Sequence, residues 1–251
     1  MSLAGRHAVV TGGTRGIGRA IASLLAREGA RVSIISRTPS VTPSASKGDA
    51  GGFYLTQCDV TDESQVQDAF AACREANGPI EILVNNSGIA ESAPLKRTDL
   101  AMWDRIIATN LTGTFLCTRE AVPEMIAAGW GRIVNVASIA GLLGAPYISA
   151  YCASKHGVVG FTRAIAAELA DGGVTVNAIC PGYTETEMMQ RTVANIAART
   201  QKSEREAREL LAQANPGGRI ATAEEVALEV LELIEGAQTG AAIVIPREVG
   251  G

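Results

Sequence analysis

The stretch HAVVTGGTRGIGRAIASLL, residues 7–25, decides the fold. A short apolar run, residues 7–10, leads into a glycine-rich turn, and apolar residues then recur at helical spacing from Ile17 to Leu25. The pattern predicts a strand, a tight turn and a helix. Glycines at positions 12, 16 and 18 would let a pyrophosphate approach the backbone at the positive end of that helix. No Gly-Lys-Ser/Thr follows, so the turn is not a P-loop.

Apolar runs and helical patterns alternate along the rest of the chain. Such alternation predicts βαβ units with right-handed crossovers, and 251 residues fit one α/β domain, residues 1–251. We therefore predict a single-domain, Rossmann-type, doubly wound parallel sheet with helices on both faces. The expected strands are residues 8–10, 32–35, 53–60, 82–84, 133–137, 174–179 and 241–245.

Three segments depart from regular alternation. Residues 38–52 are rich in Ser, Thr, Pro and Gly, which predicts a loop. Residues 183–219 are helical in pattern and mixed in charge, and they follow Pro181-Gly182, so we predict a helical substrate lid there. Pro246 cannot donate to a sheet ladder and predicts the end of the last strand.

Ser138, Tyr151 and Lys155 are spaced as a carbonyl-reducing site requires. Tyr151 and Lys155 lie four apart in a helical pattern, so a phenol and an ammonium share one face. A charge about 4 Å away contributes about 4 kcal/mol at an effective dielectric of about 20, enough to move a tyrosine pKa from about 10 toward about 7. We therefore predict that Lys155 makes Tyr151 a general acid/base, and that Ser138, ending a strand, binds the carbonyl oxygen.

The end of the second expected strand suggests which nucleotide binds. In dinucleotide folds an acidic residue at this place holds the ribose 2′-hydroxyl, whereas arginine accommodates a 2′-phosphate. Here Ser36 and Arg37 occupy that place, and Arg15 lies within the glycine-rich turn. Two cations and no carboxylate predict NADP (NADPH) in preference to NAD.

With these residues assembled, the chain resembles the short-chain dehydrogenase/reductase family from about residue 3 to residue 240. The resemblance is strongest to the 3-oxoacyl-thioester (acyl carrier protein) reductase and polyketide ketoreductase branch. Ser87 stands where that family usually has alanine, and the C-terminal end differs from the usual strand followed by Asp-Gly-Gly. The motifs that carry it are Thr11-Gly-x-x-x-Gly-x-Gly18, Asp59-Val60, Asn85-Asn-Ser-Gly88, Asn110, Ser138, Tyr151-x-x-x-Lys155 and Pro181-Gly182 with Thr186.

The resemblance implies a role for each matching residue. A catalytic tetrad would consist of Asn110, Ser138, Tyr151 and Lys155, with a water on Asn110 and the ribose hydroxyls on Lys155. Asp59 and Val60 would flank the adenine. The expected cofactor-binding residues are Gly12, Thr14, Arg15, Gly16, Ile17, Gly18, Ser36, Arg37, Asp59, Val60, Asn86, Gly88, Tyr151, Lys155, Pro181, Gly182, Thr184 and Thr186.

Composition narrows the partners and the compartment. A net charge of −4 gives no reason to expect nucleic acid, and without an apolar run of about 18 residues no membrane span is expected. The first six residues lack the apolar stretch of a signal peptide. Five scattered cysteines without Cys-x-x-Cys fit a reducing cytosol, so a cytoplasmic protein is expected. No His, Cys or carboxylate cluster predicts a metal site.

The predicted reaction is hydride transfer from NADPH to a ketone, with a 3-oxoacyl thioester on coenzyme A or acyl carrier protein as the expected substrate. Arginines of the predicted lid, with Arg219, would meet the phosphates of that carrier. Two alternatives stay open: an NAD(P)-dependent alcohol or sugar dehydrogenase working oxidatively, and a non-catalytic dinucleotide-binding sensor. The resemblance also implies a homo-oligomer, a tetramer or a dimer, paired through residues 101–128 and 151–170.

Overall fold

A seven-stranded parallel sheet forms the centre of the computed structural model, which describes residues 2–38 and 52–246. The strands lie in the order β3-β2-β1-β4-β5-β6-β7. Their bounds are β1 His7–Thr11, β2 Arg31–Ser36, β3 Tyr54–Gln57, β4 Ile82–Asn85, β5 Gly131–Val136, β6 Val174–Pro181 and β7 Ala242–Ile245. The prediction of a doubly wound parallel sheet is confirmed.

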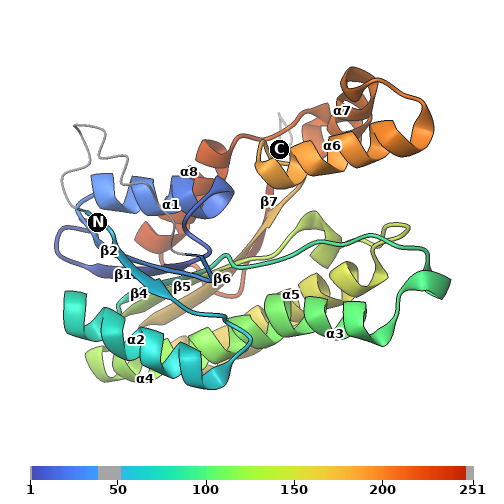
Figure 1. Cartoon of the computed structure of the whole chain (residues 1–251). Coiled ribbons are helices and arrows are strands. Elements are labelled where there is room, and N and C mark those ends of the chain that lie inside the picture. The colour runs from blue at the N-terminus through green and yellow to red at the C-terminus, as the bar shows by residue number, and fades with distance from the viewer. Residues whose placement is uncertain (1, 39–51, 247–251) are drawn as a thin grey trace.

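Helices cover both faces of this sheet, as Figure 1 shows, with α1 and α8 on one side and α2, α4 and α5 on the other. The helix bounds are α1 Gly16–Arg27, α2 Glu63–Asn77, α3 Leu100–Ile107, α4 Gly113–Ala128, α5 Ser149–Glu168, α6 Glu187–Thr200, α7 Glu204–Gln213 and α8 Ala223–Glu235. Among the described residues, no helix combines the length and the apolar character needed to cross a membrane.

The apolar core is divided between the two faces. Successive side chains of a strand point to opposite faces, so Val9 packs with one buried cluster and Val10 with the other. Val10 shares its cluster with residues of α1 and α8, whereas Val9 shares its cluster with residues of α2 and α4. This two-sided burial explains why the strands are continuous apolar runs rather than alternating ones.

β1 pairs with β2 on one side and with β4 on the other, so the chain adds strands first on one side of β1 and then on the opposite side. Connections leaving the carboxyl ends of β1 and β4 therefore diverge, and open α/β sheets bind ligands in the crevice that results. The glycine-rich turn follows β1 and Asn86 follows β4. Ser138 and Gly182 follow β5 and β6, so the predicted site residues gather at this one edge.

Residues 183–219 form the two helices α6 and α7, as expected, with a small buried cluster of their own that includes Met189, Val193 and Leu211. The two ends of this segment meet, because Thr184 forms a parallel bridge with Ala221. In Figure 1 the pair stands beyond the carboxyl edge of the sheet, separate from the α1–α8 layer.

Two boundaries bear on the sequence prediction. The third strand stops at Gln57 rather than continuing to residue 60, because the Asp59 carboxylate accepts hydrogen bonds from the Thr61 amide and hydroxyl and begins the turn into α2. β7 ends at Ile245, directly before Pro246, as predicted. Most of the predicted loop, residues 39–51, lies outside the described residues, as does the tail 247–251.

Candidate active site

The glycine-rich turn is shaped for close approach to an anion. Gly12 and Gly16 have φ values of +65° and +53°, which favour glycine, and a Cβ on Gly18 would lie 2.5 Å from the Gly12 carbonyl oxygen. The turn ends at Arg15, the N-cap of α1, which makes no side-chain cap hydrogen bond, and the first turn of α1 carries no acidic residue. By contrast, Asp62 caps α2 through its carboxylate.

The backbone amides at the start of α1, which no side chain caps, show whether this turn could bind a dinucleotide. The first N–H groups of a helix need acceptors, and phosphate oxygens are suitable ones. Ile17 and Gly18 lie in that first turn, with Thr14 just ahead of it. These residues therefore fit a pyrophosphate.

Asn86 and Thr11 hold the turn against β4. The Asn86 amide nitrogen donates to the carbonyl oxygens of Thr11 and Gly12 at 3.0 and 3.2 Å. The Thr11 hydroxyl in turn accepts from the backbone amides of Asn86 and Ser87, both at 3.0 Å. The predicted cofactor residue Asn86 thus acts on the shape of the turn, and Ser87 is accommodated without displacing it.

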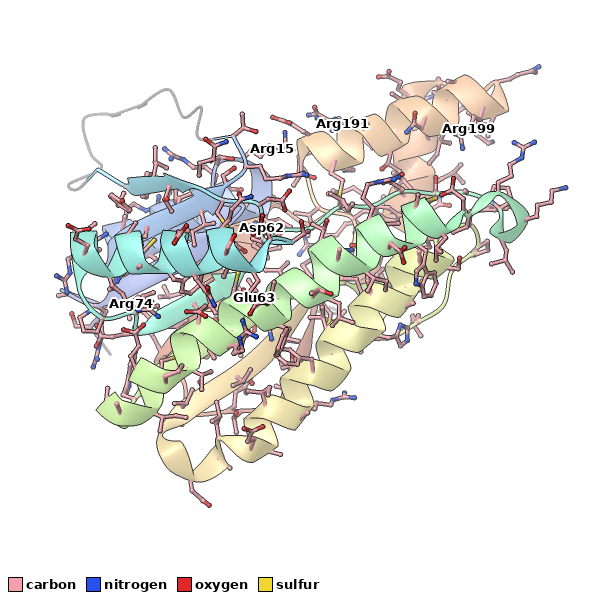
Figure 2. The ribbon with its side chains drawn as sticks, turned by 60° about the horizontal axis from the view of Figure 1, so that its bottom comes forward. Arg15, Asp62, Glu63, Arg74, Arg191 and Arg199 are labelled. Carbon is pink, nitrogen blue, oxygen red and sulfur yellow. The ribbon has the colours of Figure 1, made fainter. Side chains whose placement is uncertain are left out.

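The residues predicted to choose between nucleotides lie around the ends of β1 and β2. The hydroxyls of Thr14 and Ser36 are 3.5 Å apart, and Arg15 and Arg37 are both exposed. Arg15 extends toward the start of α6, one turn before Arg191 (Figure 2), and its Nη1 is 3.5 Å from Glu187 Oε2. Both arginines are exposed and could meet an anionic ligand, although Arg15 already pairs with Glu187.

Asp59 and Val60, predicted to flank an adenine, lie at the end of β3 but differ in exposure. Asp59 is partly exposed, whereas Val60 is buried, and its side chain faces Gly113 at the start of α4 so closely that a Cβ there would be 2.7 Å from Val60 Cγ2. The Val60 side chain therefore packs mainly in the core.

Ser138, Tyr151 and Lys155 meet where β5 ends and α5 begins. The Ser138 hydroxyl donates to the Pro181 carbonyl oxygen at 3.4 Å and lies close enough to the Tyr151 phenol to act on its pKa. Lys155 is buried and donates from Nζ to the Val136 carbonyl oxygen at 2.7 Å, with Nζ 5.8 Å from the centroid of the Tyr151 ring. The three predicted residues are therefore brought together.

The electrostatics of this group differ from the prediction. Burial raises the pKa of Tyr151 above its ordinary value, and the nearby Ser138 hydroxyl opposes that rise. Burial also lowers the pKa of Lys155, from 10.5 to about 8. The expectation that Lys155 lowers the pKa of Tyr151 is wrong for this arrangement, because desolvation disfavours the charged form of both groups and the ammonium is turned toward Val136.

Asn110 lies in a π-helical turn, residues 108–112, between α3 and α4. Its side-chain oxygen accepts from the Ile89 amide at 2.8 Å, and its side-chain nitrogen donates to the Ile89 carbonyl oxygen and to Ser154 Oγ, both at 3.0 Å. A Cβ on Gly88 would lie 3.3 Å from Asn110 Oδ1 and 3.6 Å from Lys155 Nζ. Gly88 thus lies between the Asn110 side-chain amide and the Lys155 ammonium, and a larger residue there would crowd both groups.

Pro181 ends β6, and the residues after it form the base of the α6–α7 segment. Gly182 is required by packing, because the Asn215 amide lies within contact distance of any Cβ at that position. The Thr184 and Thr186 hydroxyls donate to backbone carbonyl oxygens two residues earlier, at 3.2 and 3.1 Å. Thr186 also caps α6, so the predicted cofactor residues here define how that helix begins.

Sequence reasoning missed two structural residues. Ser154 donates to the Tyr151 carbonyl oxygen at 2.8 Å and accepts from Asn110, so it joins two predicted site residues. Asn215 accepts from the Tyr183 amide at 2.6 Å and donates to the carbonyl oxygens of Tyr183 and Arg219 at 2.7 and 2.8 Å. The only signal for Asn215 was its position before Pro216, which does not reveal a contact 32 residues away.

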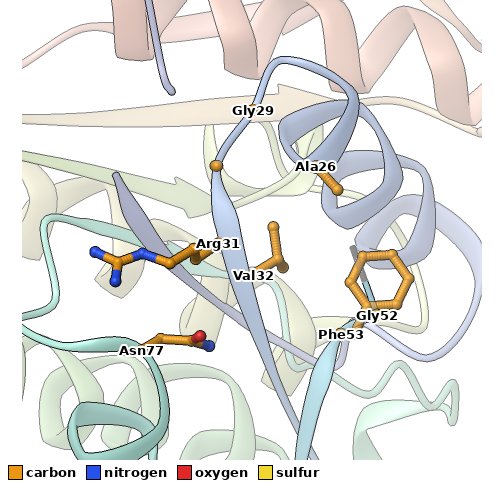
Figure 3. Close-up of a pocket in the computed structure, with 8 residues that line it drawn as sticks. Ala26, Gly29, Arg31, Val32, Gly52, Phe53 and Asn77 are labelled. Atoms are coloured by element: carbon orange, nitrogen blue, oxygen red, sulfur yellow. The ribbon is translucent and has the colours of Figure 1, made fainter. Parts of the chain in front are cut away.

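A separate hollow of about 170 Å³ lies at the opposite, amino edge of the sheet (Figure 3). Its lining includes Ala26, Arg31, Phe53 and Asn77. None of the predicted site residues lines it, so it is distinct from the crevice.

A doubly wound sheet with an uncapped glycine-rich turn and a Ser–Tyr–Lys group at its carboxyl edge defines a dinucleotide-binding oxidoreductase. A family model described as short chain dehydrogenase matches residues 6–197, and the chain belongs to that family.

Some relatives in the family are named dehydrogenases and others are named reductases. The chain is 38% identical over 235 residues to D-beta-hydroxybutyrate dehydrogenase of Rhizobium meliloti (strain 1021), with 91% of each chain covered. It is 40% identical over 232 residues to granaticin polyketide synthase putative ketoacyl reductase 1 of Streptomyces violaceoruber, covering 90% of this chain and 85% of the relative.

A solved structure of a point variant of actinorhodin polyketide ketoreductase with NADPH superimposes with a TM-score of 0.90 at 36% identity, covering 96% of this chain and 95% of the other. The protein is therefore a short-chain oxidoreductase that binds a nicotinamide dinucleotide and acts on hydroxyl or keto groups.

Proposed function

We propose that this protein is an NADPH-dependent carbonyl reductase that transfers a hydride to a ketone, with Tyr151 as the proton donor. The observation that carries the proposal is the grouping of Ser138, Tyr151 and the buried Lys155, whose Nζ lies 5.8 Å from the centroid of the Tyr151 ring, at the edge of the sheet where the glycine-rich turn also opens. When bound, the nicotinamide dinucleotide supplies the hydride.

The chain's own residues manage the oxygen and the proton. Ser138 and Tyr151 donate hydrogen bonds to the substrate carbonyl oxygen, and Tyr151 gives up its proton as the oxygen becomes a hydroxyl. Lys155, which stays mainly cationic at neutral pH with a pKa of about 8, would hold the ribose hydroxyls of the bound dinucleotide, and Asn110 keeps the neighbouring Ile89 backbone in place. Asn110, Ser138 and Lys155 are buried and Tyr151 is partly buried, which limits competition from bulk water for the same hydrogen bonds.

The raised pKa of Tyr151 supports reduction as the working direction. Reduction needs the protonated phenol, whereas oxidation needs the phenolate. Burial raises the pKa of Tyr151 above its ordinary value and so favours the protonated phenol, the form that reduction needs.

NADPH is the proposed cofactor because Arg15 and Arg37 are both exposed near the end of β2, where the sequence offers no acidic residue to accept from a ribose 2′-hydroxyl. The similarity to a ketoreductase solved with NADPH supports the same choice. Comparing kcat/KM for NADPH and NADH tests it directly, and a strong preference for NADH would remove it.

The proposed substrate is a 3-oxoacyl thioester or a related ketone. The similarity to a putative ketoacyl reductase supports it, as do the exposed apolar side chains of Leu143, Tyr147 and Met188, which stand close in the chain to Tyr151 and to the base of α6. The phosphate-binding part of the hypothesis is weaker, because Arg208 and Arg219 already pair with Glu185 and Glu225.

The deciding experiment measures NADPH consumption with 3-oxoacyl thioesters and with cyclic and aryl ketones. Tyr151→Phe should abolish turnover while leaving NADPH binding intact, since only the proton donor is lost. A variant with near-full rate would show that Tyr151 is not the acid. NADPH binding without turnover across the whole panel would favour a sensor instead.

The second candidate is a hydroxy-acid or other alcohol dehydrogenase, favoured by the similarity to D-beta-hydroxybutyrate dehydrogenase. It predicts faster oxidation of 3-hydroxy acids with NAD than reduction of any ketone with NADPH. We also propose a homo-oligomer formed through residues 101–128 and 151–170, where Phe115 and Ile126 of α4 are exposed. Light scattering of the purified protein measures its mass.

A further inference from the structure

One carboxylate connects the glycine-rich turn to the α6–α7 segment. Glu187, the first residue of α6, places Oε2 3.5 Å from Arg15 Nη1 and 3.7 Å from Arg191 Nη2. Arg15 comes from the turn after β1, whereas Arg191 lies one turn further along α6 (Figure 2). Glu187 therefore stands between a cation of the nucleotide site and a cation of its own helix.

Packing keeps Glu187 at this place independently of the ion pair. A Cβ on Gly16 would lie 3.4 Å from Thr186 Cγ2, so the turn and the start of α6 are in contact. The Thr186 hydroxyl accepts from the Met189 amide at 3.3 Å and fixes the direction in which α6 begins. The carboxylate of the next residue consequently remains near Arg15 when Arg15 turns to another partner.

A ribose 2′-phosphate and the Glu187 carboxylate would need the same guanidinium. Both are anions, and Arg15 is one of only two cations expected to meet the phosphate, the other being Arg37. An uncharged 2′-hydroxyl makes no such demand on Arg15. The presence of Glu187 therefore disfavours NADPH and leaves NADH almost unaffected.

We propose that Glu187 is a specificity-determining residue, which limits the preference for NADPH over NADH by competing with the 2′-phosphate for Arg15. This inference rests on the proposed NADPH-dependent function. It assigns to a residue of the α6–α7 segment a role in choosing the nucleotide, in addition to any contact that segment makes with substrate.

Glu187→Gln removes the charge and keeps the shape of the side chain. Exposed ion pairs contribute up to about 1 kcal/mol, so the variant should bind NADPH up to about fivefold more tightly. The dissociation constant of NADH should change by less than about twofold, because no second anion competes for Arg15. Both constants are measured by nucleotide fluorescence, without turnover.

Glu204→Gln is the matched control, because Glu204 is the corresponding first-turn acid of α7 and, within the described residues, forms no ion pair with the glycine-rich turn. It should leave both constants unchanged. In an Arg15→Gln background, Glu187→Gln should lose its effect on NADPH. The inference is overturned if Glu187→Gln leaves NADPH binding unchanged, if it tightens NADH equally, or if Glu204→Gln acts alike. A wild-type protein that prefers NADH would instead refute the proposed function.

Discussion

Replacing Lys155 by methionine should make the protein more stable while removing its activity. Lys155 is 5% exposed, and its ammonium donates to the Val136 carbonyl oxygen at 2.7 Å. Lowering its pKa from 10.5 to about 8 on folding costs on the order of 3 kcal/mol at about 1.4 kcal/mol per unit. Methionine has a similar length and carries no charge, but it forfeits a hydrogen bond of about 1 kcal/mol. The net gain at neutral pH is about 2 kcal/mol.

The pH dependence of the stability difference shows whether Lys155→Met acts by removing a desolvated charge or by improving packing. The folded pKa lies below the unfolded one, so the cost is fully present below about pH 8 and disappears as pH rises toward 10.5. Between those values the unfolded chain binds more protons, and wild-type stability gains relative to the variant. The advantage of Lys155→Met should therefore shrink steadily with rising pH.

Urea unfolding at pH 7 and at alkaline pH, at one protein concentration, measures the difference. Lys96→Met makes the same chemical change at an exposed position and should have little effect at either pH. A Lys155→Met protein less stable than wild type at pH 7 would refute the reasoning, as would an advantage that does not depend on pH.

Three further predictions concern the nucleotide site and the sheet. Arg37→Asp should shift the ratio of kcat/KM values from NADPH toward NADH, because it replaces a phosphate partner by a ribose partner. Burial lowers the pKa of His7, so wild-type stability should fall as pH drops below about 6.5, and His7→Gln should show a smaller fall in Tm over the same range. Gly18→Ala should cost about 1–3 kcal/mol, because its Cβ meets the Gly12 carbonyl oxygen, whereas Gly144→Ala, in open space, should leave Tm unchanged.

The fold could be predicted because local signals agree with it. Strands buried on both faces give uninterrupted apolar runs, and the glycines between residues 7 and 25 mark a turn that needs positive φ. The order of the motifs places the site residues at one edge of the sheet as soon as the strands are parallel. For these features, sequence spacing and three-dimensional position are almost equivalent.

The electrostatics could not be predicted in the same way. A spacing of four residues places Tyr151 and Lys155 on one helix face, but it does not reveal that Nζ turns to the Val136 carbonyl oxygen or that both groups are desolvated. Likewise the charges of residues 183–219 gave no indication that Arg208 pairs with Glu185, 23 residues away. These hydrogen-bond and ion-pair partners depend on how the helices pack, and the order of residues in the sequence does not reveal them.

Thr184 pairs with Ala221, and Asn215 hydrogen-bonds the backbone at both ends of the segment between them. The segment is therefore an insertion whose two ends lie side by side. Because the chain leaves and re-enters the domain at this one place, α6 and α7 can change in length or side chains while β6 and β7 keep their register. We expect substitutions in this segment beyond Thr186 and Glu187 to leave the group of Ser138, Tyr151 and Lys155 unchanged, so replacing that part by its counterpart from a relative would test the proposed role of the segment as a substrate lid.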